Sequence, residues 1–278
     1  MRYATFRTAD ARTVIGRLEQ GGLRELALGS TPGAGLRAAL AAGALARLTP
    51  GPLHALETVQ LLPVIPDPEK ILCAGINYHT HRIETGRAEA AHPAIFVRFA
   101  NTLIGCGAPI VRPRQSTELD YEGELAVVIG HPGRHIPTAR ALDHIAGYSC
   151  FNDASVRDWQ RHNSQFTPGK NFPATGAFGP WLVTPEEVGD PQALRVTTRL
   201  NGVVVQDQST AEMIWPVAEL VSYLSEFTAL APGDVIATGT PGGVGSRREP
   251  PLWMKPGDSV EVSIGPVGTL VNRVVQED

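Results

Sequence analysis

Acidic and apolar residues alternate along residues 118–130, which read Glu-Leu-Asp-Tyr-Glu-Gly-Glu-Leu-Ala-Val-Val-Ile-Gly. Residues two apart in a β-strand point to the same face. The pattern therefore predicts a strand with three carboxylates on one side, those of Asp120, Glu122 and Glu124. Farther along, the strand is apolar on both faces, as is typical of a strand buried in a sheet. Buried carboxylates are costly unless they are paired or bound to a cation, and oxygen ligands suit Mg²⁺, Mn²⁺ or Ca²⁺. The alternative is a strand that starts at the surface, with solvated acids at its mouth.

Short β-rich runs recur along the chain and predict further strands at 3–6, 13–18, 59–62, 70–75, 95–98, 110–112 and 145–152. Asn201-Gly202 lies between two β-rich runs, which is a strong hairpin signal. Two Pro-Gly-Asp turns, at 232–234 and 256–258, each lead into a strand, at 235–238 and 259–264. The last run, 269–275, is expected to pair with 259–264.

Helices are predicted at 36–48, 77–86, 138–143, 155–162 and 216–227. The first is expected to lie on the surface, and Asn77 is expected to cap the second. In the last, helical spacing places four apolar residues on one face, Leu220, Val221, Leu224 and Phe227. Pro216 suits its first turn.

Short strands mixed with few helices favour an α+β fold with a mostly antiparallel sheet, rolled or sandwich-like. Pro63, Pro66 and Pro68 punctuate a connection between two parts of the chain. They predict a boundary between a small N-terminal α/β domain, 1–66, and a larger domain, 67–278.

Composition narrows the classes of function. The net charge is −4 and there is no basic run, which gives no support for nucleic-acid binding. The cysteine count of three is odd and lacks a C-x-x-C pair, so neither a disulfide framework nor a zinc site is expected. No run approaches the roughly 18 apolar residues of a membrane-spanning helix, and residues 1–10 lack a signal-peptide core. These features favour a cytoplasmic protein without a membrane or nucleic-acid partner.

His81 and Glu84 lie three residues apart, which on a helix places them on one face. A carboxylate beside an imidazole fixes its tautomer and raises its basicity, as a general base requires. The alternative is an exposed pair on a loop, and His79 could compete for the role.

Asp153 follows a predicted strand, with Arg157 and Gln160 on one helical face beyond it. Arg157 could hold a substrate carboxylate. By themselves these residues favour another interpretation, in which Asp153 caps the helix and Arg157 neutralises it.

Two loops add further candidates. Lys170 lies in a Pro-Gly-Lys-Asn loop, where it could stabilise an oxyanion beside a metal or simply be solvated. The glycine-rich run 238–245 would let the backbone approach a ligand, although it lacks the ending of a P-loop.

Seven motifs in order resemble the fumarylacetoacetate hydrolase family from about residue 70 to the C-terminus. They are Gly-Ile-Asn-Tyr-x-x-His-x-x-Glu (75–84), Asp-Tyr-Glu-Gly-Glu-Leu-Ala-Val-Val-Ile-Gly (120–130), Ala-Gly-Tyr-x-x-x-Asn-Asp-x-Ser-x-Arg-Asp-x-Gln (146–160), Gly-Lys-x-Phe (169–172), Gly-Pro-Trp (179–181), Asn-Gly-x-x-x-Gln (201–206) and Pro-Gly-Asp-Val-Ile-x-Thr-Gly-Thr-Pro-x-Gly-Val-Gly (232–245). The resemblance implies that family's mixed β-sheet roll behind a variable N-terminal unit, a divalent cation and a homodimer.

The resemblance also implies roles for particular residues. The implied metal ligands are Glu122, Glu124 and Asp153, which leaves Asp120 outside the set. The implied catalytic residues are His81 and Glu84, on a lid segment, and Lys170, so His79 is demoted. The implied substrate contacts are Arg157, Gln160 and Thr240.

The activity implied is Mg²⁺-dependent (or Mn²⁺- or Ca²⁺-dependent) hydrolysis of a carbon–carbon bond in a small 1,3-dioxo acid of the acylpyruvate or fumarylpyruvate type. Glu84 would orient His81, which would activate water, and Lys170 would help hold the enolate. Isomerisation of a 2-hydroxy-diene-dioate in aromatic catabolism and decarboxylation of oxaloacetate are the alternatives within the family. A metal-binding or ligand-binding protein without turnover is the alternative of another class.

One departure bears on the substrate. Many members of the family read Gly-Lys-Ser-Phe-Asp followed soon by Cys-Pro, whereas here Pro173 replaces the Asp and Gly176-Ala177 replace Cys-Pro. This stretch is expected beside the site, so the resemblance does not carry over the identity of the substrate.

Overall fold

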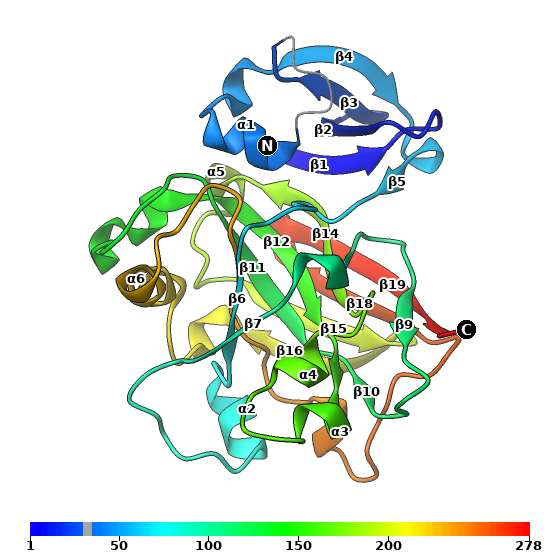
Figure 1. The fold of residues 1–278 in the computed structure, drawn as a ribbon, viewed down its shortest axis with the longest axis vertical. Coiled ribbons are helices and arrows are strands. Elements are labelled where there is room, and N and C mark those ends of the chain that lie inside the picture. The colour runs from blue at the N-terminus through cyan, green and yellow to red at the C-terminus, as the bar shows by residue number, and fades with distance from the viewer. Residues whose placement is uncertain (30–34) are drawn as a thin grey trace.

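Two β-sheets packed face to face organise the protein, whose computed structural model describes residues 1–29 and 35–278 (Figure 1). In sheet order, the large sheet contains β4 (Thr49–His54), β3 (Gly22–Ala27), β2 (Thr13–Glu19), β1 (Arg2–Arg7), β14 (Gly176–Val183), β12 (Ile145–Asp153), β11 (Gly123–Ile129), β17 (Val235–Ala237), β6 (Ile71–Gly75) and β7 (Ala94–Val97). Two short strands extend it, β5 (Gln60–Leu61) beside β1 and β8 (Leu103–Ile104) beside β14.

The smaller sheet is built mainly from the C-terminal third of the chain. Its strands, in order, are β16 (Val203–Ser209), β15 (Arg195–Leu200), β18 (Ser259–Ile264), β19 (Gly268–Gln276) and β9 (Ile110–Arg112). A separate short ladder joins β10 (Leu119–Asp120) to β13 (Ser155–Val156). Most pairs are antiparallel, and the parallel ones are β6 with β17, β8 with β14 and β9 with β19. This arrangement confirms the predicted α+β class with a mostly antiparallel sheet.

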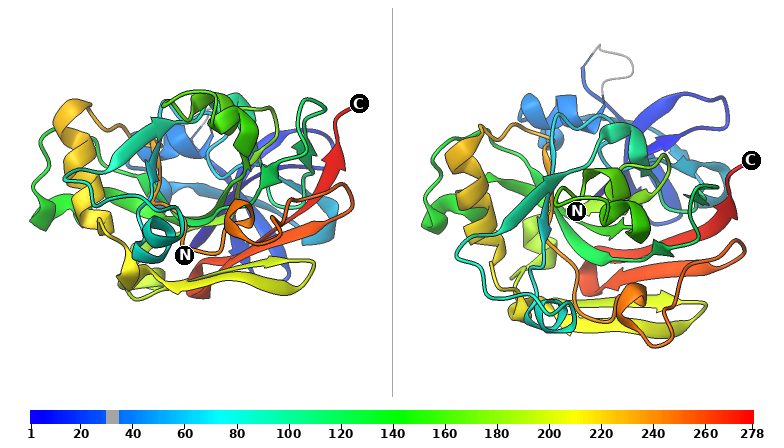
Figure 2. Two further views of the ribbon diagram at one scale, coloured as in Figure 1. Left: turned by 90° about the horizontal axis from the view of Figure 1, so that it is seen from below. Right: turned by 60° about the horizontal axis from the view of Figure 1, so that its bottom comes forward.

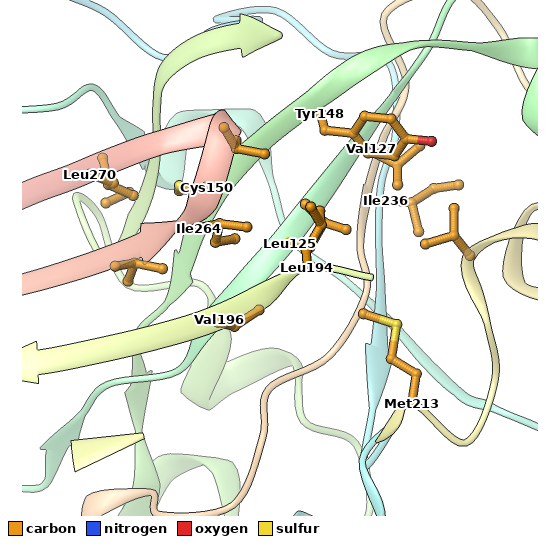
Figure 3. Close-up of a cluster of buried hydrophobic side chains, with 14 of the residues drawn as sticks. Leu125, Val127, Tyr148, Cys150, Leu194, Val196, Met213, Ile236, Ile264 and Leu270 are labelled. Carbon is orange, nitrogen blue, oxygen red and sulfur yellow. The ribbon is translucent and has the colours of Figure 1, made fainter. Parts of the chain in front are cut away.

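β11 is buried on both faces, as its sequence predicts. Leu125 and Val127 point into the core between the two sheets, where they meet side chains from β15, β18 and β19 (Figure 3). Ala126 and Val128 point the other way, into a second core shared with the N-terminal strands and the first helix. Complete burial of a Leu or Val side chain contributes roughly 1.5–3 kcal/mol, so these contacts hold β11 firmly at the centre of the large sheet.

The helices are short. They are α1 (Leu36–Ala41), α2 (His79–Glu84), α3 (Arg157–Gln160), α4 (Thr167–Lys170), α5 (Pro185–Val188) and α6 (Val217–Phe227). α2, α3 and α4 gather at the end of the molecule opposite the N-terminal strands, and the right-hand view of Figure 2 turns that end forward. No helix in the described part of the chain is long and apolar enough to cross a bilayer.

Several helix predictions need correction. α1 stops at Ala41 because Gly43, with φ +56°, reverses the chain, and the amides of Gly43 and Ala44 then bond back to Leu40 and Ala39. The segment predicted at 138–143 is a 3₁₀ helix, Thr138–His144. The segment predicted at 155–162 is the strand β13 followed by the single turn of α3. α6 matches its prediction, except that Phe227 is 54% exposed.

Asn77 does not cap α2, since Tyr78 precedes the helix and gives no side-chain cap. The Asn77 side chain instead donates to the carbonyls of Trp215 and Thr238, at 3.0 and 2.7 Å, and accepts from the Trp215 amide. It thereby ties the start of the α2 segment to the end of β17.

The prediction of one strand over 118–130 is wrong at its start. The chain leaves β10 after Asp120 and enters β11 at Gly123, so Asp120 and Glu124 belong to different ladders. Asp120 accepts hydrogen bonds from the amides of Tyr121, Gly245 and Ser246. It is therefore a structural acid.

Five strands of the described chain were not predicted, β3, β4, β8, β13 and β14. β14 lies in the middle of the large sheet although it contains Pro180, which cannot donate to a ladder. The ladder between β12 and β14 shifts register between Tyr148 and Cys150, opposite that part of β14, and this irregularity accommodates the proline. The predicted hairpin is present, with Asn201 and Gly202 at φ +52° and +80°.

The N-terminal strands form one end of the large sheet (Figure 1). β1 pairs with β14, with Tyr3 opposite Leu182, so the sheet continues from this unit into the rest of the molecule.

Candidate active site

Three buried carboxylates meet where β11 begins and β12 ends. Gly123 pairs with Asn152 in register, and the Asp153 amide donates to the Glu122 carbonyl at 2.9 Å. One carboxylate oxygen from each of Glu122, Glu124 and Asp153 lies within 4.8 Å of the others. The structure therefore brings together the three implied metal ligands.

Three buried cations surround these acids. Lys170 Nζ donates to Glu122 Oε2 at 2.7 Å and to Asp153 Oδ2 at 2.6 Å. Arg98 reaches the other oxygen of Asp153 at 2.5 Å, and Arg157 reaches Glu122 Oε1 at 2.6 Å. Arg157 also pairs with Asp120 at 2.8 Å, so the cluster holds four carboxylates against three cations.

With four carboxylates and three cations, one carboxylate has no cationic partner, and that carboxylate is Glu124. Burial raises the pKa of Glu124 well above its usual range, and the nearby negative charges of Asp153 and Glu122 raise it further. For Glu122, burial also opposes ionisation, but the positive charges of Lys170 and Arg157 outweigh it and lower the pKa to about 2. Glu124 accepts one hydrogen bond, from the Gly239 amide at 2.8 Å.

This donor set fits a hard divalent cation. The ligands are oxygen atoms on the rigid ends of two paired strands, which Mg²⁺, Mn²⁺ and Ca²⁺ prefer. A cation beside Glu124 would offset the repulsion that raises its pKa. The buried acidic triad could therefore hold a divalent metal.

The His81–Glu84 pair is formed on α2. His81 Nδ1 lies 2.7 Å from Glu84 Oε1, and the His81 residue is only 6% exposed. Glu84 is held in turn by the Gly243 amide, which donates to its Oε2 at 2.8 Å. His81 Nε2 is thus left for chemistry, whereas His79 is exposed and does not line the same pocket.

The glycine-rich segment approaches its neighbours too closely for side chains. A Cβ at Gly243 would lie 2.3 Å from the Val205 carbonyl oxygen, and the residue has φ +104°. A Cβ at Gly239 would lie 2.6 Å from the Asn77 Cβ. Both glycines carry amides that bind site carboxylates, so the segment positions Glu84 and Glu124 through its backbone.

A pocket of about 340 Å³ opens onto this cluster. Seven of the implied residues line it, His81, Glu122, Glu124, Arg157, Gln160, Lys170 and Thr240. Glu84 and Asp153 do not line it and act from behind His81 and Lys170.

The implied substrate contacts differ in whether they have a hydrogen-bonding group free for a ligand. Arg157 donates to Gln160 Oε1 at 2.8 Å, and its buried NH2 nitrogen has no hydrogen-bond partner in the described chain. Thr240 is already used, because its hydroxyl donates to the Gly123 carbonyl and accepts from Gln206. Arg157 therefore has a free donor, while Thr240 mainly braces the start of β11.

Comparison with known proteins identifies the family. The family model described as fumarylacetoacetate (FAA) hydrolase C-terminal matches residues 70–275. The chain belongs to the fumarylacetoacetate hydrolase family.

Other members of the fumarylacetoacetate hydrolase family carry more specific names. Over 219 residues the chain is 42% identical to the human mitochondrial oxaloacetate tautomerase FAHD2A, covering 78% of this chain and 70% of that protein. It is 42% identical to oxaloacetate tautomerase YisK of Bacillus subtilis, covering 80% and 75%. The structure of 5-carboxymethyl-2-hydroxymuconate delta-isomerase from Mycobacterium smegmatis matches over the whole of both chains, with 33% identity and a TM-score of 0.82.

The structure corrects two interpretations that the isolated motifs favoured. Asp153 does not cap α3, which follows Val156, and it pairs with Arg98 and Lys170 rather than Arg157. Lys170 is not solvated, since it is only 1% exposed.

Arg98 is the residue that the sequence did not reveal. Its guanidinium is fully buried, and it binds Asp153, the Ala154 carbonyl and Thr175. It lies at the end of a predicted strand with no recognisable motif around it, so only its partners in the fold identify its role.

The departures from the family pattern lie outside the lining of the pocket. Neither Pro173 nor Gly176-Ala177 lines it. A Cβ at Gly176 would lie 3.0–3.2 Å from the guanidinium of Arg98. The glycine therefore leaves room for the arginine that holds Asp153.

Proposed function

We propose that this protein is a divalent-cation-dependent enzyme that interconverts the keto and enol forms of a 2-oxo acid of the oxaloacetate class. The observation that carries the proposal is the placement of His81. Its Nδ1 is held by Glu84, and it lines the same small pocket as the carboxylates of Glu122 and Glu124. The names of the human and Bacillus subtilis relatives support this choice of chemistry over hydrolysis.

In this proposal the metal is Mg²⁺, held by Glu122, Glu124 and Asp153. When bound, the cation supplies Lewis-acid polarisation of the substrate's carbonyl, which makes the neighbouring carbon more acidic. The free NH2 donor of Arg157 would hold the carboxylate next to that carbonyl.

The proton transfer belongs to His81. Its Nε2 takes a proton from the carbon beside the carbonyl; the electron pair of that C–H bond forms the carbon–carbon double bond of the enolate, and the π pair of the carbonyl moves to its oxygen. The imidazolium then returns the proton to that oxygen, which gives the enol without a net change of charge. Glu84 favours the tautomer that leaves Nε2 unprotonated at the start.

Lys170 would stabilise the oxygen on which negative charge develops. Two of its N–H groups are directed at Glu122 and Asp153, but its third polar contact, with the Asp153 carbonyl, is long at 3.4 Å. The third N–H of Lys170 is therefore only weakly hydrogen-bonded and remains available to a substrate oxygen. Negative charge on Asp153 and Glu122 outweighs the effect of burial and raises the pKa of Lys170, so it stays a cation.

Hydrolysis of a carbon–carbon bond is the second candidate. It is favoured by the same dyad, because a buried His with a carboxylate partner can activate water as well as abstract a proton from carbon. Isomerisation of a 2-hydroxy-diene-dioate uses the same enolate chemistry, and the mycobacterial isomerase supports it as a variant of the proposal.

A substrate panel tests the proposal. The protein loaded with Mg²⁺ or Mn²⁺ is mixed with enol-oxaloacetate, with an acylpyruvate and with a 2-hydroxy-diene-dioate, and the ultraviolet absorbance of each is followed. We expect accelerated ketonisation of oxaloacetate that stops when the metal is chelated. Cleavage of the acylpyruvate alone would establish hydrolysis instead, and no turnover of any of the three would favour a binding protein.

A further inference from the structure

Charged side chains line the pocket both in its buried part and at its exposed mouth. The acids that line it are Glu122 and Glu124, and both are buried. Three arginines at the outer part are exposed or largely exposed, Arg87, Arg161 and Arg247. The buried part of the lining thus combines these acids with two cations, Lys170 and Arg157, whereas the exposed charged residues at the mouth are all arginines.

The three outer arginines differ in their partners. Arg161 is paired with Glu118 at 2.5 Å. Arg87 and Arg247 have no carboxylate within ion-pairing distance among the residues that the structure describes. Both guanidinium groups are therefore available to pair with an anionic group of a bound ligand.

Hydrogen bonds hold the two segments that carry these arginines side by side. The Gly242 amide donates to Thr80 Oγ1 at 3.0 Å, and the Gly243 amide donates to Glu84 Oε2 at 2.8 Å. Arg87 follows α2 and its amide bonds to the Arg82 carbonyl, while Arg247 follows the glycine-rich segment. The contacts that position the His81–Glu84 pair therefore also position both arginines.

We propose that Arg87 and Arg247 form a subsite for a second carboxylate of the substrate, at the end farthest from the metal ligands. This inference rests on the proposed function, which places the 2-oxo acid end at Glu122 and Glu124. Oxaloacetate is a 2-oxo dicarboxylate, and the inference assigns recognition of its distal carboxylate to these two side chains. The two arginines are specificity-determining residues and take no part in proton transfer.

A comparison of two ligands that differ only at the distal end tests the subsite separately from the rest of the pocket. Malate and lactate are 2-hydroxy acids that differ in the distal carboxylate and cannot enolise. Their dissociation constants are measured by calorimetry on Mg²⁺-loaded protein for the wild type, Arg87→Gln and Arg247→Gln. Each substitution is expected to weaken malate binding about tenfold, the size of one charge-assisted hydrogen bond, and to leave lactate binding unchanged.

Arg161→Gln is the control, because it removes the same charge from the same rim at an arginine that already has a partner. The subsite is overturned if Arg161→Gln weakens malate as much as the other two, if lactate weakens in parallel with malate, or if the wild type does not prefer malate to lactate.

The experiment separates this inference from the proposed function. The comparison of malate with lactate needs no turnover, so it can succeed even if oxaloacetate is not a substrate. Conversely, oxaloacetate turnover with an unchanged KM in Arg87→Gln and Arg247→Gln would keep the proposed function and reject the subsite.

Discussion

Individual acids in the site differ in whether their charge is already satisfied. Asp120 accepts three backbone amides and pairs with Arg157, so nothing remains for it to bind. Glu124 has a single amide donor and two acidic neighbours. The same residue type in the same short stretch is structural at one position and a candidate ligand at the other.

Glu124→Gln should separate stability from metal binding. The substitution removes like-charge repulsion and keeps an oxygen for the Gly239 amide, so the metal-free protein should unfold at the wild-type temperature or above. The Mg²⁺-induced rise in unfolding temperature should disappear in this variant. In the wild type, a hundredfold excess of cation over Kd raises the free energy of unfolding by about 2.7 kcal/mol. Thermal unfolding with and without Mg²⁺ measures both. Glu118→Gln, a control outside the triad, should keep the full rise, and a persisting rise in Glu124→Gln would move the metal elsewhere.

The pH dependence of the metal-free protein follows from the same group. The pKa of Glu124 is raised, so its contribution to stability is present at low pH and is lost as pH rises through that raised pKa. Glu122 behaves oppositely, and its contribution is lost as pH falls from its ordinary value of 4.5 toward about 2. We expect unfolding temperatures to fall at the raised Glu124 pKa and Mg²⁺ to abolish that fall. Above pH 4.5, where Glu122 is already ionised, a rise of the unfolding temperature through the raised Glu124 pKa in the metal-free protein would contradict the assignment.

His81→Gln should abolish turnover and leave the metal in place. A positioned general base contributes about 10²–10⁴-fold to rate, and His81 touches none of the implied ligands through a hydrogen bond. The rate of oxaloacetate ketonisation and the Mg²⁺ dissociation constant are measured together. The exposed neighbour gives the control His79→Gln, which should be normal in both, and retained activity in His81→Gln would remove the base from the mechanism.

At the scale of elements, the site depends on where strands and helices end. Glu122 and Asp153 meet because β11 and β12 pair in a fixed register, and His81 reaches the pocket because α2 is anchored to the glycine-rich segment. The alternation of residues in β11 predicted its two buried faces correctly. It did not predict the break after Asp120, because that break depends on a separate pairing with β13.

Gly243→Ala tests this anchoring. The added Cβ would lie 2.3 Å from the Val205 carbonyl oxygen, so the segment must shift and take the Glu84 hydrogen bond with it. We expect a large loss of kcat with little change in Mg²⁺ affinity. Gly257→Ala is the matched control, because Gly257 has φ +96° but open space around it. It should cost only the roughly 1–2 kcal/mol of a left-handed residue, and equal effects on kcat would refute the anchoring role.

At the scale of the molecule, the buried cluster of acids and cations is built from segments far apart in the sequence. Arg98 directly follows β7, and Glu122 directly precedes β11. Asp153 ends β12, and Lys170 ends α4. The two cores on either side of β11 hold these segments in place. The resemblance named the candidate ligands and the lysine, but the compensating arginine lay outside its motifs.

The assembly state remains a prediction at this scale. We propose a homodimer, as the family resemblance implies. Light scattering of the purified protein at several concentrations measures its mass against the 29.7 kDa of one chain. A mass of one chain at all concentrations would contradict the proposal.

The sequence by itself determined the buried character of β11, the Asn-Gly hairpin, the α6 helix and, through the family motifs, which acids and which histidine to test. These features depend on local periodicity and on residue order, which are readable along a chain. The tertiary structure alone decided that Asp120 is satisfied, that Lys170 is buried between two carboxylates, and that Arg98 holds Asp153. It did so because the charge balance of a buried site depends on partners contributed by distant segments, and no local pattern records those partners.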